Sequence, residues 1–161
     1  ARIIEGKDKE NTLKTTPEIS FTAPKAKILV VDDNEVNLHV ARGFMKRYGI
    51  AIEMATRGID AVEMVKKKKY DIIFMDHLMP EMDGIETADE IRKIDNDYAK
   101  FIPVVALTAN VSEDAKKMFM EKGFRGFMTK PIQSDVLSGI LLKNLPEELI
   151  VEKEQTEERG V

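Results

Sequence analysis

Five polar residues with complementary chemistry each follow a short apolar run. They are three aspartates, Asp32, Asp33 and Asp76, one threonine, Thr108, and one lysine, Lys130. Three carboxylates held close together repel one another unless a cation lies among them, and oxygen ligands favour Mg²⁺ or Ca²⁺. A metal, a lysine and a hydroxyl around one carboxylate are the groups that phosphoryl transfer requires, because the negative charge of the phosphoryl oxygens must be neutralised. A carboxylate can itself accept the group.

The apolar runs alternate with stretches that have the period of amphipathic helices. After Asn34, a typical N-cap residue, the residues Val36, Val40, Phe44 and Tyr48 form an apolar stripe, and Gly49 ends the helix. Five such units predict an α/β fold: a doubly wound, five-stranded parallel sheet with helices on both faces. The predicted strands are 27–31, 52–55, 72–75, 104–107 and 126–128, and the predicted helices follow Asn34, Gly58, Gly84, Ser112 and Ser134.

This fold explains how distant residues form one site. The carboxyl ends of parallel strands meet at one edge of the sheet, and binding sites form there, where the strand order reverses. The three aspartates, the threonine and the lysine all follow predicted strands. We therefore expect their side chains to converge.

Composition limits the possible functions. The chain has 161 residues, a net charge of −4 and no cysteine, which excludes disulfides, thiolate catalysis and cysteine-ligated metals. The acidic balance argues against nucleic-acid binding. No apolar run approaches the roughly 20 residues of a membrane span, so we expect a cytoplasmic location and no membrane contact by this segment. Polar residues without a period predict a flexible linker at 1–24 and an acidic C-terminal tail at 146–161, around a folded domain at 25–145.

Four separated motifs occur in the same order as in a known family. They are ILVVDDN at 28–34, DHLMPEMDG at 76–84, LTAN at 107–110 and Lys130-Pro131. Together they resemble the receiver domain of two-component response regulators, which has a flavodoxin-like fold. A linker before the domain and too few residues after it for a DNA-binding domain favour a receiver from a hybrid sensor histidine kinase.

The resemblance implies a metal site. Asp76 matches the residue that accepts a phosphoryl group from a phosphohistidine in a Mg²⁺-dependent step. Asp33 matches a direct Mg²⁺ ligand, Asp32 a carboxylate that holds metal-bound water, and Leu78 a residue whose backbone carbonyl is a ligand. The expected cofactor is therefore Mg²⁺.

The resemblance also implies a switch. Thr108 and Lys130 match the residues that contact the phosphoryl group, and Phe127 occupies the switch position that is often tyrosine in the family. The implied partner is a histidine kinase dimerisation domain or a histidine phosphotransfer domain, docked near the strand carboxyl ends and the first helix. A receiver assists its own phosphorylation and dephosphorylation without being a conventional enzyme.

Other functions remain as alternatives. A stand-alone or truncated response regulator would have the same motifs. A flavodoxin-like flavin carrier is less favoured, because 32–35 is acidic and lacks the glycine of a phosphate-binding turn. A phosphatase with an aspartate nucleophile is also less favoured, because Asp76 is followed by His77 and Leu78, with no second acid two residues on.

Overall fold

The apolar runs form one parallel sheet in the computed structural model, which describes residues 20–109 and 111–152. Its strand order is β3-β2-β4-β5-β6, and all neighbouring strands are parallel. The chain passes from β2 to β3 on one side and then to β4 on the other, so the order reverses between β2 and β4. The predicted doubly wound, flavodoxin-like fold is confirmed. The strands are β2 (Ile28–Val31), β3 (Ile52–Ala55), β4 (Ile72–Asp76), β5 (Val104–Thr108) and β6 (Gly126–Thr129).

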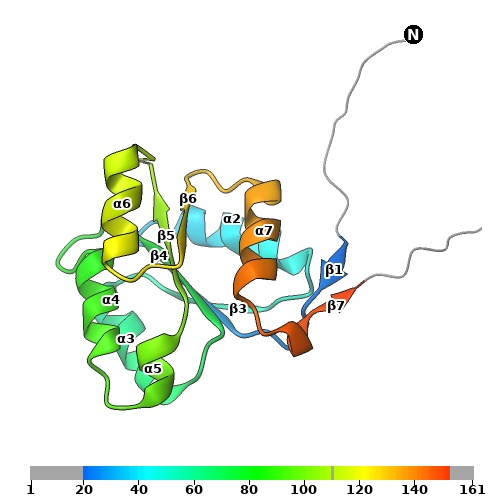
Figure 1. Ribbon diagram of the computed structural model, residues 1–161, viewed down its shortest axis with the longest axis horizontal. Helices are drawn as coiled ribbons and strands as arrows, with labels where there is room; N and C mark the ends of the chain where they lie inside the picture. Colours follow the sequence, from blue (N-terminus) through cyan, green and yellow to red (C-terminus); the bar gives the residue numbers. More distant parts are fainter. Residues whose placement is uncertain (1–19, 110, 153–161) are drawn as a thin grey trace, which may run out of the picture.

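Helices cover both faces of the sheet (Figure 1). On one face lie α2 (Glu35–Lys46) and α7 (Ser134–Asn144), and on the other lie α3 (Gly58–Lys67), α4 (Gly84–Arg92) and α6 (Glu113–Glu121). Side chains alternate between the two faces along a strand. Ile28 and Val30 therefore pack under α2 and α7, whereas Leu29 and Val31 pack under the other three helices.

The buried face of α2 differs from the predicted stripe. Leu38, Ala41 and Met45 are buried against the sheet, whereas Val36 and Val40 are 69% and 41% exposed; of the predicted stripe, Tyr48 is buried. Both sets repeat with helical spacing, so periodicity alone cannot choose between them. The consequence is an apolar strip on the surface of α2.

The helix α5 (Asp97–Phe101) was not predicted. It consists of five residues, too few to establish a helical period, and lies between α4 and β5. The side chain of Asn96 caps it by accepting a hydrogen bond of 2.7 Å from the backbone N–H of Ala99. Among the described residues, no helix is long and apolar enough to cross a membrane.

The folded unit extends beyond the predicted bounds of 25–145. β1 (Phe21–Thr22) pairs antiparallel with β7 (Val151–Glu152), which follows the short 3-10 helix η1 (Glu147–Leu149). The two strands lie side by side at the right of Figure 1. Phe21 is 1% exposed, and its ring centroid lies 4.9 Å from that of Tyr48. Residues 20–24 and 146–152 are therefore ordered parts of the domain, and two-residue strands have no period that could have predicted them. The rest of the predicted linker and tail lies outside the described residues.

The start of α4 lies against the strand that carries Asp76. Asp83 caps this helix: its side chain accepts a hydrogen bond of 2.8 Å from the backbone N–H of Glu86, whose side chain accepts one of 3.0 Å from the Asp83 N–H. A Cβ atom added to Gly84 would lie 2.3 Å from the backbone oxygen of Asp76. Only glycine allows the helix to approach the strand this closely.

We therefore expect Gly84→Ala to destabilise the fold by about 1–3 kcal/mol, the usual cost of overpacking. Urea denaturation followed by circular dichroism measures this change. Gly139→Ala in α7 is the matched control, because a Cβ there has no neighbour within 4 Å, and alanine is the better helix former. Equal stability of the two variants would contradict the close approach.

Candidate functional site

The structure brings the predicted site residues together at the carboxyl edge of the sheet. Asp32 and Asp33 follow β2, Asp76 ends β4, Thr108 ends β5, and Lys130 follows β6. One carboxylate oxygen from each of the three aspartates lies within 4.8 Å of the other two. Asp32 and Asp76 are buried, and Asp33 is exposed.

Lys130 connects the carboxylates. Its Nζ donates a hydrogen bond of 2.7 Å to Oδ1 of Asp76 and lies 3.7 Å from Oδ2 of Asp32. The backbone N–H of Lys130 donates to the carbonyl oxygen of Thr108 at 3.1 Å, which continues the pairing of β5 and β6 up to the site. The peptide bond between Lys130 and Pro131 is cis.

The first turn of α2 fixes Asp32. Its Oδ1 accepts a hydrogen bond of 2.9 Å from the backbone N–H of Asn34, and its Oδ2 accepts one of 3.1 Å from the side-chain amide of Asn37. Asn34 also caps α2 by accepting hydrogen bonds from the N–H groups of Val36 and Asn37. Asn37 was not predicted as a site residue. The sequence contains one signal that could have identified Asn37: it is a polar residue in the first turn of a helix that begins beside an aspartate pair.

Asp76 has one bonded and one unbonded oxygen. The residue is 1% exposed, and its Oδ2 has no hydrogen-bond partner among the described residues. Burial raises the pKa of Asp76 to about 6; the hydrogen bond from Lys130 opposes this rise, and the negative charge of Asp32 adds to it. Burial alone would lower the pKa of Lys130, but its hydrogen bond to Asp76 and the nearby carboxylates raise it above its usual value.

The raised pKa of Asp76 predicts a pH-dependent stability. In the folded protein Asp76 holds its proton up to about pH 6, compared with 3.8 for an unperturbed aspartate. Between these values the folded state binds more protons than the unfolded state, so stability falls as the pH rises, by at most about 1.4 kcal/mol per pH unit.

Replacing Asp76 with asparagine removes this titration. We expect the free energy of unfolding of Asp76→Asn, relative to the wild type, to increase from pH 4 to pH 7 in metal-free buffer. Urea denaturation at several pH values measures the difference. A constant difference across this range would show that the pKa of Asp76 is not raised.

The donor set fits a divalent cation. Three carboxylates face one lysine, which leaves negative charge uncompensated, and no described residue donates a hydrogen bond to the buried Oδ2 of Asp76. Hard oxygen ligands at this spacing are those that Mg²⁺ prefers. Among the described residues, the carboxylates of Asp32, Asp33 and Asp76 form a cluster that can hold Mg²⁺.

The remaining predicted site residues surround this cluster. Leu78 lies in the loop between β4 and α4 and is 72% exposed. Thr108 is buried at the end of β5. Phe127 in β6 is partly buried against α6, where Nζ of Lys116 lies 5.4 Å from the ring centroid. Asn110, the last residue of the LTAN motif, lies outside the described residues.

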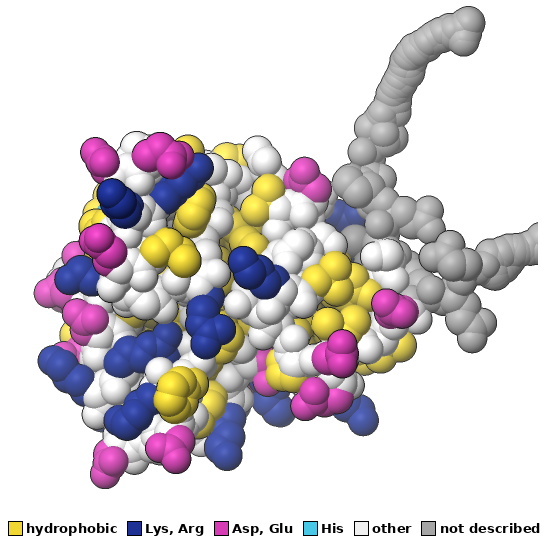
Figure 2. All heavy atoms as spheres, in the orientation of Figure 1, with side chains coloured by type: hydrophobic (Ala, Val, Ile, Leu, Met, Phe, Trp, Pro, Cys, Tyr) yellow, Lys and Arg dark blue, Asp and Glu magenta, His cyan; other side chains and the backbone are white. Residues whose placement is uncertain are grey.

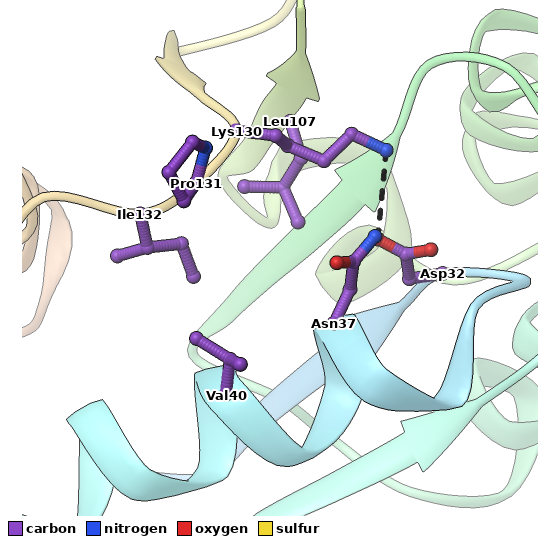
Figure 3. Close-up of a pocket in the computed structure, with 7 residues that line it drawn as sticks. All are labelled: Asp32, Asn37, Val40, Leu107, Lys130, Pro131 and Ile132. Carbon is purple, nitrogen blue, oxygen red and sulfur yellow. Dashed lines mark hydrogen bonds and ion pairs between the residues drawn. The ribbon is translucent and has the colours of Figure 1, made fainter.

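A small cavity of about 50 Å³ lies beside the site, between α2 and the loop after β6 (Figure 3). A cavity of this size holds one or two water molecules rather than a flavin. Asp32, Asn37 and Lys130 point toward one another at its polar end. Its apolar end is formed by Val40, Leu107, Pro131 and Ile132.

Comparison with known sequences gives one family over most of the chain. The family described as the response regulator receiver domain matches residues 28–142. The hybrid signal transduction histidine kinase B of Dictyostelium discoideum is 35% identical over 147 residues, which covers 85% of this chain and 8% of that protein. The chain spans between 8% and 23% of the length of four such curated relatives.

Solved structures of receivers are also similar. The receiver domain of the sensor histidine kinase PA1611 from Pseudomonas aeruginosa, solved with magnesium in its active-site cleft, is 30% identical with a TM-score of 0.66. The match covers 74% of this chain and 96% of that one. The Saccharomyces cerevisiae complex of the phosphotransfer protein Ypd1 with the receiver domain of Ssk1 matches at 29% identity with a TM-score of 0.68, covering 79% of this chain and 91% of that one.

Proposed function

The chain belongs to the response regulator receiver family, and from this premise we propose that Asp76 accepts a phosphoryl group from a phosphohistidine in a Mg²⁺-dependent step. The observation that carries the proposal is the state of the Asp76 carboxylate. It is buried at the switch point of the sheet, one oxygen is bonded to Lys130, and the other has no donor among the described residues. The carboxylate is thus held in place and still able to react.

The transfer forms one bond and breaks one. A carboxylate oxygen of Asp76 attacks phosphorus while the phosphorus–nitrogen bond of the phosphohistidine breaks, and the imidazole nitrogen keeps the electron pair of that bond. Lys130 lies 2.7 Å from the acceptor carboxylate, where its ammonium can neutralise a phosphoryl oxygen. Thr108, at the end of the neighbouring strand, supplies a hydroxyl at the same carboxyl edge of the sheet.

Residues of the chain can also bind the metal. Asp33 and Asp76 would bind Mg²⁺ directly, Asp32 through water, and the backbone carbonyl of Leu78 would complete the protein ligands. When bound, Mg²⁺ supplies the positive charge that stabilises the transferring phosphoryl group. The magnesium in the cleft of the PA1611 receiver supports this assignment.

The surface next to Asp76 suits a helical partner. Val36 and Val40 of α2 and Leu78 of the β4–α4 loop are exposed apolar side chains on elements that border the site. An apolar strip beside a reactive carboxylate fits the helices of a histidine phosphotransfer or dimerisation domain. The complex of Ypd1 with the Ssk1 receiver supports such a partner.

The parent protein that we propose is a cytoplasmic phosphorelay component of the hybrid histidine kinase type. The similarity to a hybrid kinase of Dictyostelium discoideum supports it. A stand-alone response regulator would use the same chemistry at Asp76. On the face seen in Figure 2, basic and acidic side chains are interspersed, a distribution that does not favour nucleic-acid binding.

The proposal is tested by incubating the protein with a small-molecule phosphodonor and measuring its intact mass. We expect a gain of about 80 Da, the mass of one phosphoryl group, in the presence of Mg²⁺ and none after chelation. No gain with Mg²⁺, or an equal gain in chelator, would refute the proposal.

Phosphorylation is expected to rearrange one face of the domain. Because Thr108 ends β5 and Lys130 follows the adjacent β6, drawing both toward a phosphoryl group shifts their loops and lets Phe127 turn inward, away from Lys116. Amide NMR spectra with and without a beryllofluoride mimic measure this change. We expect shifts from α6 through β6 to α7. Shifts confined to the loop after Asp76, with residues 112–141 unchanged, would contradict the switch.

A further inference from the structure

We infer that Asn37 is a positioning residue of the magnesium site, because its side-chain amide holds the buried carboxylate of Asp32 in the orientation that the metal's water requires. The inference rests on the proposed function, since it assigns a role within the same site. It adds a residue that lies outside the three aspartates, the threonine and the lysine.

The environment of Asp32 limits the donors that its carboxylate can meet. The residue is 0% exposed, so bulk water cannot hydrogen-bond its carboxylate. Among the described residues, Asn37 is the only one whose side chain donates a hydrogen bond to Asp32, at 3.1 Å to Oδ2. The other donor is the backbone N–H of Asn34, at 2.9 Å to Oδ1. Each carboxylate oxygen thus has one neutral donor among the described residues, and the donors are the N-cap and a first-turn residue of α2.

Lys130 cannot replace Asn37 as the side-chain donor to Asp32. Its Nζ is 2.7 Å from Asp76 and 3.7 Å from Asp32, so its hydrogen bond goes to Asp76. In the proposed reaction Lys130 also contacts the phosphoryl group. Asn37 has no second role of this kind, and its amide can hold Asp32 both before and after phosphoryl transfer.

The space around Asp32 would allow its carboxylate to turn. Asn37 and Asp32 border the cavity of about 50 Å³ (Figure 3). Without the amide, Oδ2 of Asp32 would face the cavity on one side and the ammonium of Lys130 on the other. The carboxylate could then turn toward Lys130, which would weaken the hold on metal-bound water and draw Lys130 from Asp76.

The test measures the affinity of Mg²⁺ itself by isothermal titration calorimetry. We expect Asn37→Leu to bind Mg²⁺ about 10–100-fold more weakly than the wild type, the usual loss when an outer partner of a metal ligand is removed. Asn37→Ser, which is polar but too short to reach Asp32, should show the same loss of Mg²⁺ affinity. It replaces Asn37→Leu as the test variant if the leucine variant does not fold. Asn37→Gln keeps the amide and can extend into the cavity, so it should recover most of the affinity.

The matched control is His39→Leu, an exposed position on the same helix. We expect it to bind Mg²⁺ like the wild type. Wild-type affinity in both Asn37→Leu and Asn37→Ser would overturn the inference, as would an equal loss in His39→Leu or no recovery in Asn37→Gln. If the wild-type protein itself binds no Mg²⁺, the proposed function fails, and this inference fails with it.

Discussion

Asp76→Asn is expected to abolish phosphorylation. In intact-mass measurements with a small phosphodonor and Mg²⁺, the variant should gain no phosphoryl group, whereas the wild type gains about 80 Da. Asparagine has nearly the shape of aspartate, and its amide oxygen can still accept the hydrogen bond from Lys130. It lacks the negative charge that makes the carboxylate a nucleophile, so the loss should be complete.

The control for this variant is the same substitution away from the site. Asp95→Asn changes an exposed aspartate in the segment between α4 and α5 and should be phosphorylated like the wild type. Retention of the 80 Da adduct by Asp76→Asn would mean that another residue accepts the phosphoryl group. Loss of the adduct in both variants would mean that the substitution acts through folding rather than chemistry.

The convergence of the site could be predicted because it depends on topology. Each of the runs before Asp33, Asp76 and Lys130 is short and apolar, and parallel strands bring their carboxyl ends to one edge. The sequence therefore predicted the fold and the neighbourhood of these residues. Topology alone does not determine that Lys130 hydrogen-bonds Asp76 and not Asp32, because that choice depends on a difference of 1 Å between side chains.

The features that sequence analysis missed have a common physical origin. Phe21 lies in a two-residue strand that pairs with one from the other end of the chain, and its ring packs against Tyr48; a single apolar residue has no period. Val36 and Val40 have helical spacing but face outward, because Leu38 on the same helix packs into the core instead. Asn37 acts through one hydrogen bond to a buried neighbour. Each depends on a partner that only the folded chain provides.

A comparison of Asp33→Ala with Lys130→Ala is expected to separate metal binding from switching. Asp33 contributes a ligand oxygen to the carboxylate cluster, so Asp33→Ala should bind Mg²⁺ at least about tenfold more weakly, since even outer partners of a metal site cause such a loss. Lys130→Ala removes a positive charge beside the same carboxylates, which leaves the ligands in place and removes a competitor of the cation. Its affinity for Mg²⁺ should equal or exceed that of the wild type.

Beryllofluoride tests the other property, the conformational response, and here the variant expected to change is Lys130→Ala. Lys130→Ala retains the metal ligands but has no ammonium to draw β6 toward the phosphoryl mimic, so the amide signals around Phe127 should stay at their resting positions even with the mimic bound. A phosphoryl group that contacts both conformations equally shifts no population, and Lys130 provides one of the contacts that differ between them. Titration with Mg²⁺ and NMR with the mimic measure the two effects separately. Wild-type affinity in Asp33→Ala would refute the ligand assignment, and a normal shift of Phe127 in Lys130→Ala would show that the switch runs through Thr108 alone.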